Sequence, residues 1–192
     1  ELAALKDKID FAVPMTHLLI KDDKQFAKDV PEFPLIMGGH DHTNMKHIVG
    51  NTVITKADAN AKTVYIHRIS FDHATKKITV KSELKEVNES INEDPKTAQV
   101  VKTWLKHANQ GFDSLGFDIK EKLMDLKGTT LDARESKIRE EPTNMGKDIC
   151  EAMLATIPAA KVAILNSGSV RLDDELRGQV TVYDVLRTLP YG

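Results

Sequence analysis

The chain has 192 residues, with 27 Lys and Arg against 29 Asp and Glu, and 41% of its residues are hydrophobic. This composition predicts a globular protein whose length allows one large domain or two small ones. The near-balance of charge lacks the basic excess of proteins that bind a phosphate backbone, so no nucleic-acid partner is expected. No stretch approaches the ~20 consecutive apolar residues of a membrane span, so no span is expected in this chain. The single cysteine, Cys150, excludes an internal disulfide and a multi-cysteine zinc site.

The N-terminal part predicts two short strands separated by a helix. Residues 9–15 are mostly apolar and predict a strand that runs into His17. A polar stretch at residues 22–30 predicts a helix, and the apolar residues 34–37 predict the second strand. That strand stops at a pair of glycines, which can adopt backbone angles that other residues avoid. A loop is therefore expected at the carboxyl end of the second strand.

Residues 47–87 show the alternation of apolar and polar residues that is typical of strands. Turn signals interrupt the alternation at Gly50 and again at Asp72. We therefore expect three antiparallel strands in this region, around residues 53–54, 64–69 and 78–80.

A long helix is predicted in the middle of the chain. Asp94 suits the N-cap position and Pro95 the first helical position, and apolar residues then recur at helical spacing until Gly111. This helix is our candidate for an interdomain helix. Beyond it the sequence predicts a strand, a helix and a short buried strand, at residues 117–126, 143–157 and 162–165.

The loop after the second strand carries two histidines, His40 and His42, on either side of Asp41. Two imidazoles on one tight loop can point into a single site, where their neutral ring nitrogens suit Mn, Fe, Zn or Co. A solvated polar loop is the alternative explanation of such a pair. His17 stands at the end of the preceding strand, and the carboxyl ends of strands converge on one edge of an open α/β sheet. The three histidines could therefore share one site.

Two kinds of metal site remain open from these residues. Three histidines and a water would complete a zinc site. A site for two metals needs bridging carboxylates and further ligands, and no other carboxylate stands at a matching strand end. Asp41 is expected to point away from the metal, where it would orient an imidazole or be solvated. The remaining histidines are assigned to strands, turns or a helix surface: His47, His67, His73 and His107.

A set of short motifs makes the chain resemble the 5′-nucleotidase family, which includes ecto-5′-nucleotidase and the bacterial periplasmic UDP-sugar hydrolases. The resemblance runs from about residue 9 to the last residue. The motifs occur in the family's order and lie at residues 16–18 (THL), 35–42 (LIMGGHDH), 144–146 (NMG), 165–171 (LNSGSVR) and 189–192 (LPYG).

The resemblance implies an α/β (α+β) fold in three parts. Residues 1–92 would be the C-terminal part of a calcineurin-like metallophosphoesterase β-sandwich with flanking helices. Residues 93–112 would be a linker helix, and residues 113–192 the N-terminal part of an α/β 5′-nucleotidase substrate-binding domain. The family's other metal ligands and its catalytic histidine would lie upstream of this chain, and its second stacking aromatic downstream. The chain is therefore expected to be an internal part of a larger enzyme.

The resemblance also implies functional residues. His17, His40 and His42 match metal ligands of a centre that holds two divalent ions, which would be Zn, Mn, Fe or Co. Two such ions polarise phosphoryl oxygens and generate a hydroxide near neutral pH. The catalytic group itself has no counterpart in these residues.

Further positions match substrate contacts of the family. Arg139, Asn166 and Arg171 would bind the nucleotide, and Tyr191 would stack on the base. Arg139 also lies in the charged run 137–141, which is usually a solvated face. Guanidinium groups suit phosphate or ribose oxygens, and an Asn side chain both donates and accepts.

The function implied is that of a metal-dependent phosphohydrolase that converts nucleoside monophosphates or related nucleotides to nucleoside and phosphate. The chain alone is expected to be inactive. The alternative is a non-catalytic nucleotide-binding or metal-binding module. By analogy with the family, the location would be periplasmic, secreted or at the cell surface.

Overall fold

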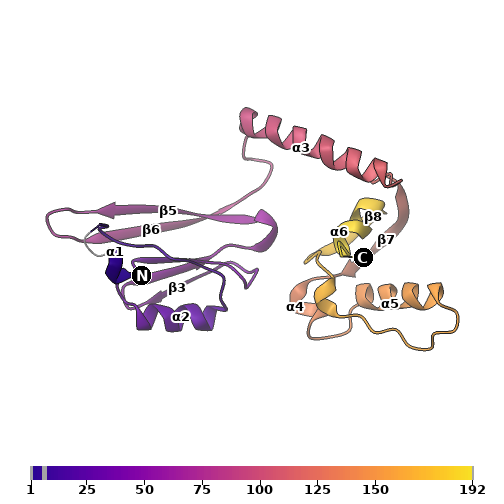
Figure 1. Ribbon diagram of the computed structural model, residues 1–192, viewed down its shortest axis with the longest axis horizontal. Coiled ribbons are helices and arrows are strands. Elements are labelled where there is room, and N and C mark those ends of the chain that lie inside the picture. Colours follow the sequence, from indigo (N-terminus) through magenta and orange to yellow (C-terminus); the bar gives the residue numbers. More distant parts are fainter. Residues whose placement is uncertain (1, 6–7, 192) are drawn as a thin grey trace. The chain divides into compact units, whose positions relative to one another are not determined.

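A computed structural model describes residues 2–5 and 8–191 of the chain, which divides into two compact units, Glu1–Asn92 and Glu93–Gly192. Both units combine helices with strands, so the mixed α/β class is confirmed (Figure 1). Among the described helices, none is both long enough and apolar enough for a membrane crossing.

A four-stranded sheet with the order β1-β2-β4-β3 forms the centre of the first unit. β1, β2 and β4 run parallel, and β3 is antiparallel to β4. Because β1 and β2 are parallel neighbours, the residues that follow them emerge at the same edge of the sheet. The strands span Met15–Thr16 (β1), Leu35–Gly38 (β2), Met45–Val49 (β3) and Thr52–Lys56 (β4).

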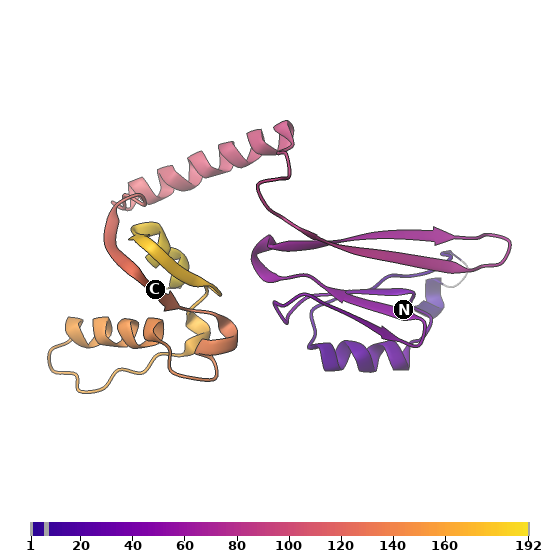
Figure 2. The same ribbon diagram turned by 180° about the vertical axis from the view of Figure 1, so that it is seen from behind.

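Helix α2 (Ile20–Asp29) covers one face of this sheet (Figures 1 and 2). Ala27 of the helix is buried against Ile36 and Ile54 of the two central strands. Burying such apolar side chains is the main contribution that this face makes to stability.

The opposite face of the sheet is covered by a hairpin of two long strands, β5 (Thr63–Phe71) and β6 (Ile78–Glu86) (Figures 1 and 2). His67 joins the layers. Its Nδ1 lies 2.9 Å from Oγ of Ser82 on β6, and its Nε2 lies 3.3 Å from Oγ1 of Thr55 on β4. The first unit is therefore a sandwich of a sheet and a hairpin, with a helix outside the sheet.

In the second unit, β7 (Lys122–Asp132) pairs antiparallel with β8 (Glu175–Thr181), and α5 (Asn144–Thr156) packs against β7. The buried core is formed by Ala133, Met145, Val170, Leu172, Leu176 and Val180. Helix α6 follows β8 without a loop. The remaining helices and helical turns span Leu2–Leu5 (α1), Ala59–Ala61 (η1), Pro95–Ser114 (α3), Glu135–Ile138 (α4), Ser167–Ser169 (η2) and Val182–Thr188 (α6).

The two longest predicted helices are confirmed, and α3 has the N-cap that was expected. The side chain of Asp94 accepts a hydrogen bond from N of Thr97 at 2.8 Å, and Pro95 opens α3. The helix continues to Ser114, past Gly111. Thr143 caps α5 by accepting from N of Gly146 at 3.2 Å.

The strand predictions need correction. Region 47–87 holds parts of four strands rather than three. The additional strand is β3, which precedes the turn at Gly50 and pairs with β4 on the other side of it. Only the end of the predicted strand 9–15 is paired, as β1.

The predicted buried strand at residues 162–165 is wrong. Val162 and Ile164 are 73% and 85% exposed, and the segment pairs with no strand among the described residues. An apolar segment forms a β-strand only where the backbone of another strand can hydrogen-bond with it, so apolar character alone does not specify a strand.

Acidification is expected to destabilise the first unit through His67. Burial lowers the pKa of His67, and the charge of Lys46 lowers it further. The unfolded chain, with a histidine pKa of about 6.5, then binds the proton more readily than the folded one. Stability is therefore unaffected by this group above pH ~6.5 and decreases as the pH falls below that value.

Urea unfolding at pH 7.5 and 5.5 checks this expectation. His67→Gln should lose less stability between the two pH values than the wild type does. The exposed His73 provides the control, because His73→Gln should keep the wild-type dependence. An equal dependence in wild type and His67→Gln would contradict the assignment.

Candidate functional site

Two histidine-bearing turns meet at the edge of the sheet where β1 and β2 end. The first turn carries His17 and the second carries His40. The backbone N–H of Gly39 donates to the carbonyl oxygen of Thr16 at 2.9 Å and joins the turns. The two imidazole rings lie 5.1 Å apart, centroid to centroid, nearly perpendicular to each other. The structure thus brings together two of the three predicted metal ligands, both exposed to solvent.

His42 lies two residues further along the second turn and is also exposed. Among the described side chains, the ring nitrogens of the three histidines do not all lie within 4.8 Å of one another. A shared ion would therefore need a change of side-chain rotamer. His40 and His42 have positive φ angles of 78° and 59°, which L-residues rarely adopt. Such strain persists only where the surrounding contacts determine the backbone.

The paired glycines have a different role from the one expected. Positive φ falls on the histidines, whereas the glycines allow close packing. A Cβ on Gly38 would lie 2.8 Å from Cε of Lys56 and 3.1 Å from Oδ2 of Asp23. A Cβ on Gly39 would lie 3.2 Å from Nδ1 of His17. Side chains at these two positions would thus displace the groups around the histidines.

A buried lysine, Lys56, lies beneath both turns. It is the last residue of β4, directly opposite Gly38 in the parallel register, and its side chain is only 1% exposed. Its Nζ lies 2.7 Å from Oδ2 of Asp23 and forms an ion pair with Asp41. It also donates to the carbonyl oxygens of Leu18 and of Gly39, the latter at 2.9 Å.

Asp41 links the second turn to helix α2. Its Oδ1 accepts a hydrogen bond from N of Ile20 at 3.4 Å, at the start of the helix, where a negative charge is favoured by the helix dipole. Burial alone would raise the pKa of Asp41. The hydrogen bond and charge of Lys56, with smaller effects of Ile20 and His40, outweigh the burial, and the pKa lies below its ordinary value. Asp41 is therefore held as a carboxylate.

Sequence reasoning missed the role of Lys56. Two buried residues of β4, Ile54 and Thr55, directly precede it, and a lysine after such residues is normally taken to reach solvent. The only signal was its position at the end of a strand that adjoins the Gly-Gly turn.

In the second unit, Asn166 and Arg171 lie at one turn. The Asn166 side chain accepts from N of Gly168 at 3.1 Å and holds the η2 turn. Nη1 of Arg171 lies 3.5 Å from the carbonyl oxygen of Gly168, and its backbone N donates to Thr188, the last residue of α6, at 2.9 Å. Both predicted substrate residues are exposed on this turn.

Arg139 and Tyr191 are also at the surface of the second unit. Nη2 of Arg139 forms an ion pair with Oε1 of Glu135 at 2.6 Å, one helical turn earlier. Tyr191 is 79% exposed, three residues after the end of α6. Gly192, the last residue of the predicted LPYG motif, lies outside the described residues.

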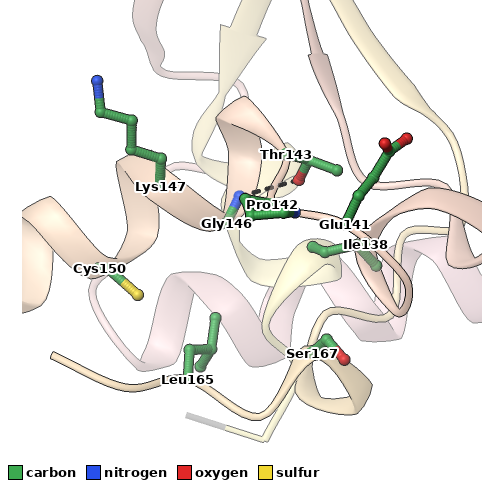
Figure 3. A pocket seen from close by; sticks show the side chains of 9 residues that line it. All are labelled: Ile138, Glu141, Pro142, Thr143, Gly146, Lys147, Cys150, Leu165 and Ser167. Atoms are coloured by element: carbon green, nitrogen blue, oxygen red, sulfur yellow. Dashed lines mark hydrogen bonds between the residues drawn. The ribbon is translucent and has the colours of Figure 1, made fainter.

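The second unit also holds a pocket of about 250 Å³ (Figure 3). Ile138, which precedes Arg139, contributes to its lining, and so do Leu165 and Ser167 on either side of Asn166. Arg139 and Asn166 are thus chain neighbours of residues that line the cavity, and neither is itself among the lining residues. Thr143 and Gly146, joined by the capping hydrogen bond of α5, line the pocket as well.

Comparison with known proteins agrees with the motifs. Residues 122–192 match the sequence profile of the 5′-nucleotidase C-terminal domain. The trifunctional nucleotide phosphoesterase protein YfkN of Bacillus subtilis is 26% identical over 197 residues, which cover 97% of this chain and 13% of YfkN. The resemblance to the 5′-nucleotidase family is confirmed. Bovine 5′-nucleotidase is 24% identical over 234 residues, which cover the whole of this chain and 39% of the bovine protein. The chain thus spans less than half the length of either relative.

Two solved structures share the fold of this chain. A protein from Staphylococcus aureus assigned as a 5′-nucleotidase, in complex with α-ketoglutarate, aligns with a TM-score of 0.51 and 14% identity over 98% of this chain and 38% of its own. The sulfate thiohydrolase SoxB of Thermus thermophilus, in complex with glycerol, aligns with a TM-score of 0.63 and 18% identity over 97% of this chain and 32% of its own. At these identities the likeness concerns the fold alone.

Proposed function

We propose that the protein is a metal-dependent phosphohydrolase of the 5′-nucleotidase type, which releases phosphate from nucleoside monophosphates or related nucleotides. The observation that carries the proposal is the pairing of two histidine-bearing turns at the carboxyl edge of the sheet, with the rings of His17 and His40 5.1 Å apart. The similarity to nucleotide phosphoesterases supports the choice of substrate class.

The residues at the sheet edge suit a divalent metal by their chemistry, and a change of side-chain rotamer would bring the three imidazoles onto one ion. Imidazole nitrogens suit Zn, Mn, Fe or Co, and His17, His40 and His42 are all accessible from solvent. Gly39 leaves the space beside Nδ1 of His17 that a larger residue would fill. When bound, two such ions supply Lewis acidity toward a phosphoryl oxygen and lower the pKa of a water. In this proposal the three histidines hold the metal centre.

The second unit would bind the nucleoside part of the substrate. Asn166 and Arg171 present an amide and a guanidinium from one turn, and these groups suit ribose and base oxygens or a phosphate. Arg139 would add a second guanidinium beside the pocket. Tyr191 offers an exposed flat ring on which a base can stack. By the same analogy, we propose a periplasmic, secreted or cell-surface location.

Replacing His40 and His42 together by Ala is expected to weaken metal binding strongly and to abolish hydrolysis, because it removes two of the three imidazole ligands. Isothermal titration with Co²⁺ should show an affinity reduced by more than about tenfold, since even groups behind the ligands contribute ~10- to 100-fold. In the full-length protein, EDTA-sensitive release of phosphate from AMP should disappear. The control is the double replacement of His73, in the turn between β5 and β6, and His107, on α3, neither of which is a predicted ligand. Survival of both metal binding and hydrolysis would contradict the proposal.

Arg171→Ala is expected to weaken AMP binding by about tenfold or more, because a hydrogen bond to a charged group contributes ~1.5–3 kcal/mol. Arg177→Ala is the matched control, since Arg177 is an exposed arginine of the same unit that pairs with Glu175. Equilibrium titration with AMP, with and without EDTA, measures both variants. Equal affinity in wild type and Arg171→Ala would overturn the assignment of Arg171. Binding that is tight in EDTA, without hydrolysis, would favour the alternative of a nucleotide-binding module.

A further inference from the structure

We propose that Lys56 is a positioning residue, which fixes the two histidine-bearing turns relative to each other so that they can hold a metal. The inference rests on the proposed function and extends it to a residue that does not itself bind the metal or the substrate. Its basis is the set of oxygens that surround the Lys56 ammonium group.

Each predicted ligand is the immediate neighbour of a residue that Lys56 contacts. Leu18, whose carbonyl oxygen accepts from Nζ, follows His17. Gly39, whose carbonyl oxygen accepts at 2.9 Å, precedes His40. Asp41, which forms the ion pair, lies between the two histidines of the second turn. One side chain thus connects both turns.

Burial makes these contacts obligatory for the lysine. Lys56 and Asp23 are 1% and 0% exposed, so the ammonium group cannot reach water. The Asp23 carboxylate accepts no hydrogen bond from any described residue, and the charge of Lys56 is what compensates it. A buried ion pair generally contributes little to stability compared with apolar residues of the same volume. A more specific benefit is the fixed geometry of the groups that the pair holds.

The backbone of the second turn is strained in a way that needs such a restraint. His40 and His42 both have positive φ, and Asp41 stands between them. Asp41 is held from two sides, by Lys56 and by the N–H of Ile20. Without the ammonium group the turn would be free to relax, and the backbone that carries His40 and His42 would no longer be fixed.

The charge of the network also favours a cation. One ammonium group faces two carboxylates, those of Asp23 and Asp41, so the network carries a net negative charge. Lys56 therefore neutralises only part of the negative charge next to the histidines, and the site remains attractive to a divalent ion.

The test compares the loss of the Lys56 contacts with the loss of another buried polar contact of strand β4. The double variant Lys56→Met with Asp23→Ala removes the two fully buried charges together, so that neither is left in the interior without the other. The Asp41 carboxylate, which is 14% exposed, stays and loses its ion-pair partner. Thr52→Val is the matched control. Thr52 is a buried polar residue at the other end of β4, and its hydroxyl donates to the carbonyl oxygen of Phe33 at 2.7 Å, away from both turns.

Three measurements are made on the whole chain: urea unfolding, Co²⁺ affinity by titration, and hydrogen exchange of the peptides that contain residues 16–20 and 38–44. We expect the double variant to bind Co²⁺ about 10- to 100-fold more weakly than the wild type, the range typical of groups that orient metal ligands. Exchange should be faster in the two turns. Thr52→Val should lose stability but keep both the wild-type affinity and the slow exchange of the turns.

The inference would be overturned if the double variant had the same Co²⁺ affinity and the same hydrogen exchange in the turns as Thr52→Val. Failure of the proposed metal centre has a separate signature, because the wild type would then bind no Co²⁺, or would bind it equally well after replacement of His40 and His42 by Ala. In that case the exchange data still decide: unchanged exchange in the turns of the double variant would overturn the positioning role of Lys56 as well.

Discussion

The ammonium group of Lys56 is the point on which the histidine-bearing edge of the first unit depends. It lies at the end of β4, between helix α2 and the turns that follow β1 and β2, and oxygens from all three of these segments surround it. The close packing around Lys56 requires residues without a side chain at positions 38 and 39. Gly38 leaves space for the lysine and its partner Asp23, and Gly39 leaves space for His17. A lysine is costly to bury, and its pairing limits the positions that the two turns can adopt.

The two units divide the work that the proposed function requires. The first supplies imidazoles at the edge of a parallel sheet, where ligand sites of open α/β sheets commonly form. The second supplies an amide and guanidinium groups around the η2 turn and the adjoining pocket, together with an exposed aromatic ring. Each set is held by contacts within its own unit. The relatives of this chain are considerably longer, so the activity proposed is that of the whole protein.

Local signals in the sequence predicted those elements that depend on local contacts. The N-cap of α3, the helix α5 and the end of β2 at the glycines were predicted because each is specified by residues close together in the chain. Strand β8 was missed because its buried residues, Leu176 and Val180, are separated by polar residues and by a register shift. The role of Lys56 depends on partners 15 to 38 residues away in the chain, which no local pattern reveals.

X-ray absorption spectroscopy of the chain loaded with Zn²⁺ tests the central claim most directly, because it reports the atoms bound to the metal. The account predicts imidazole scattering from His17, His40 and His42, with Zn–N distances of about 2.0–2.1 Å. The imidazole signal should be lost when these histidines are replaced by Ala. A coordination shell of oxygen alone, or an imidazole signal that survives these replacements, would contradict the assignment of the metal centre to the sheet edge.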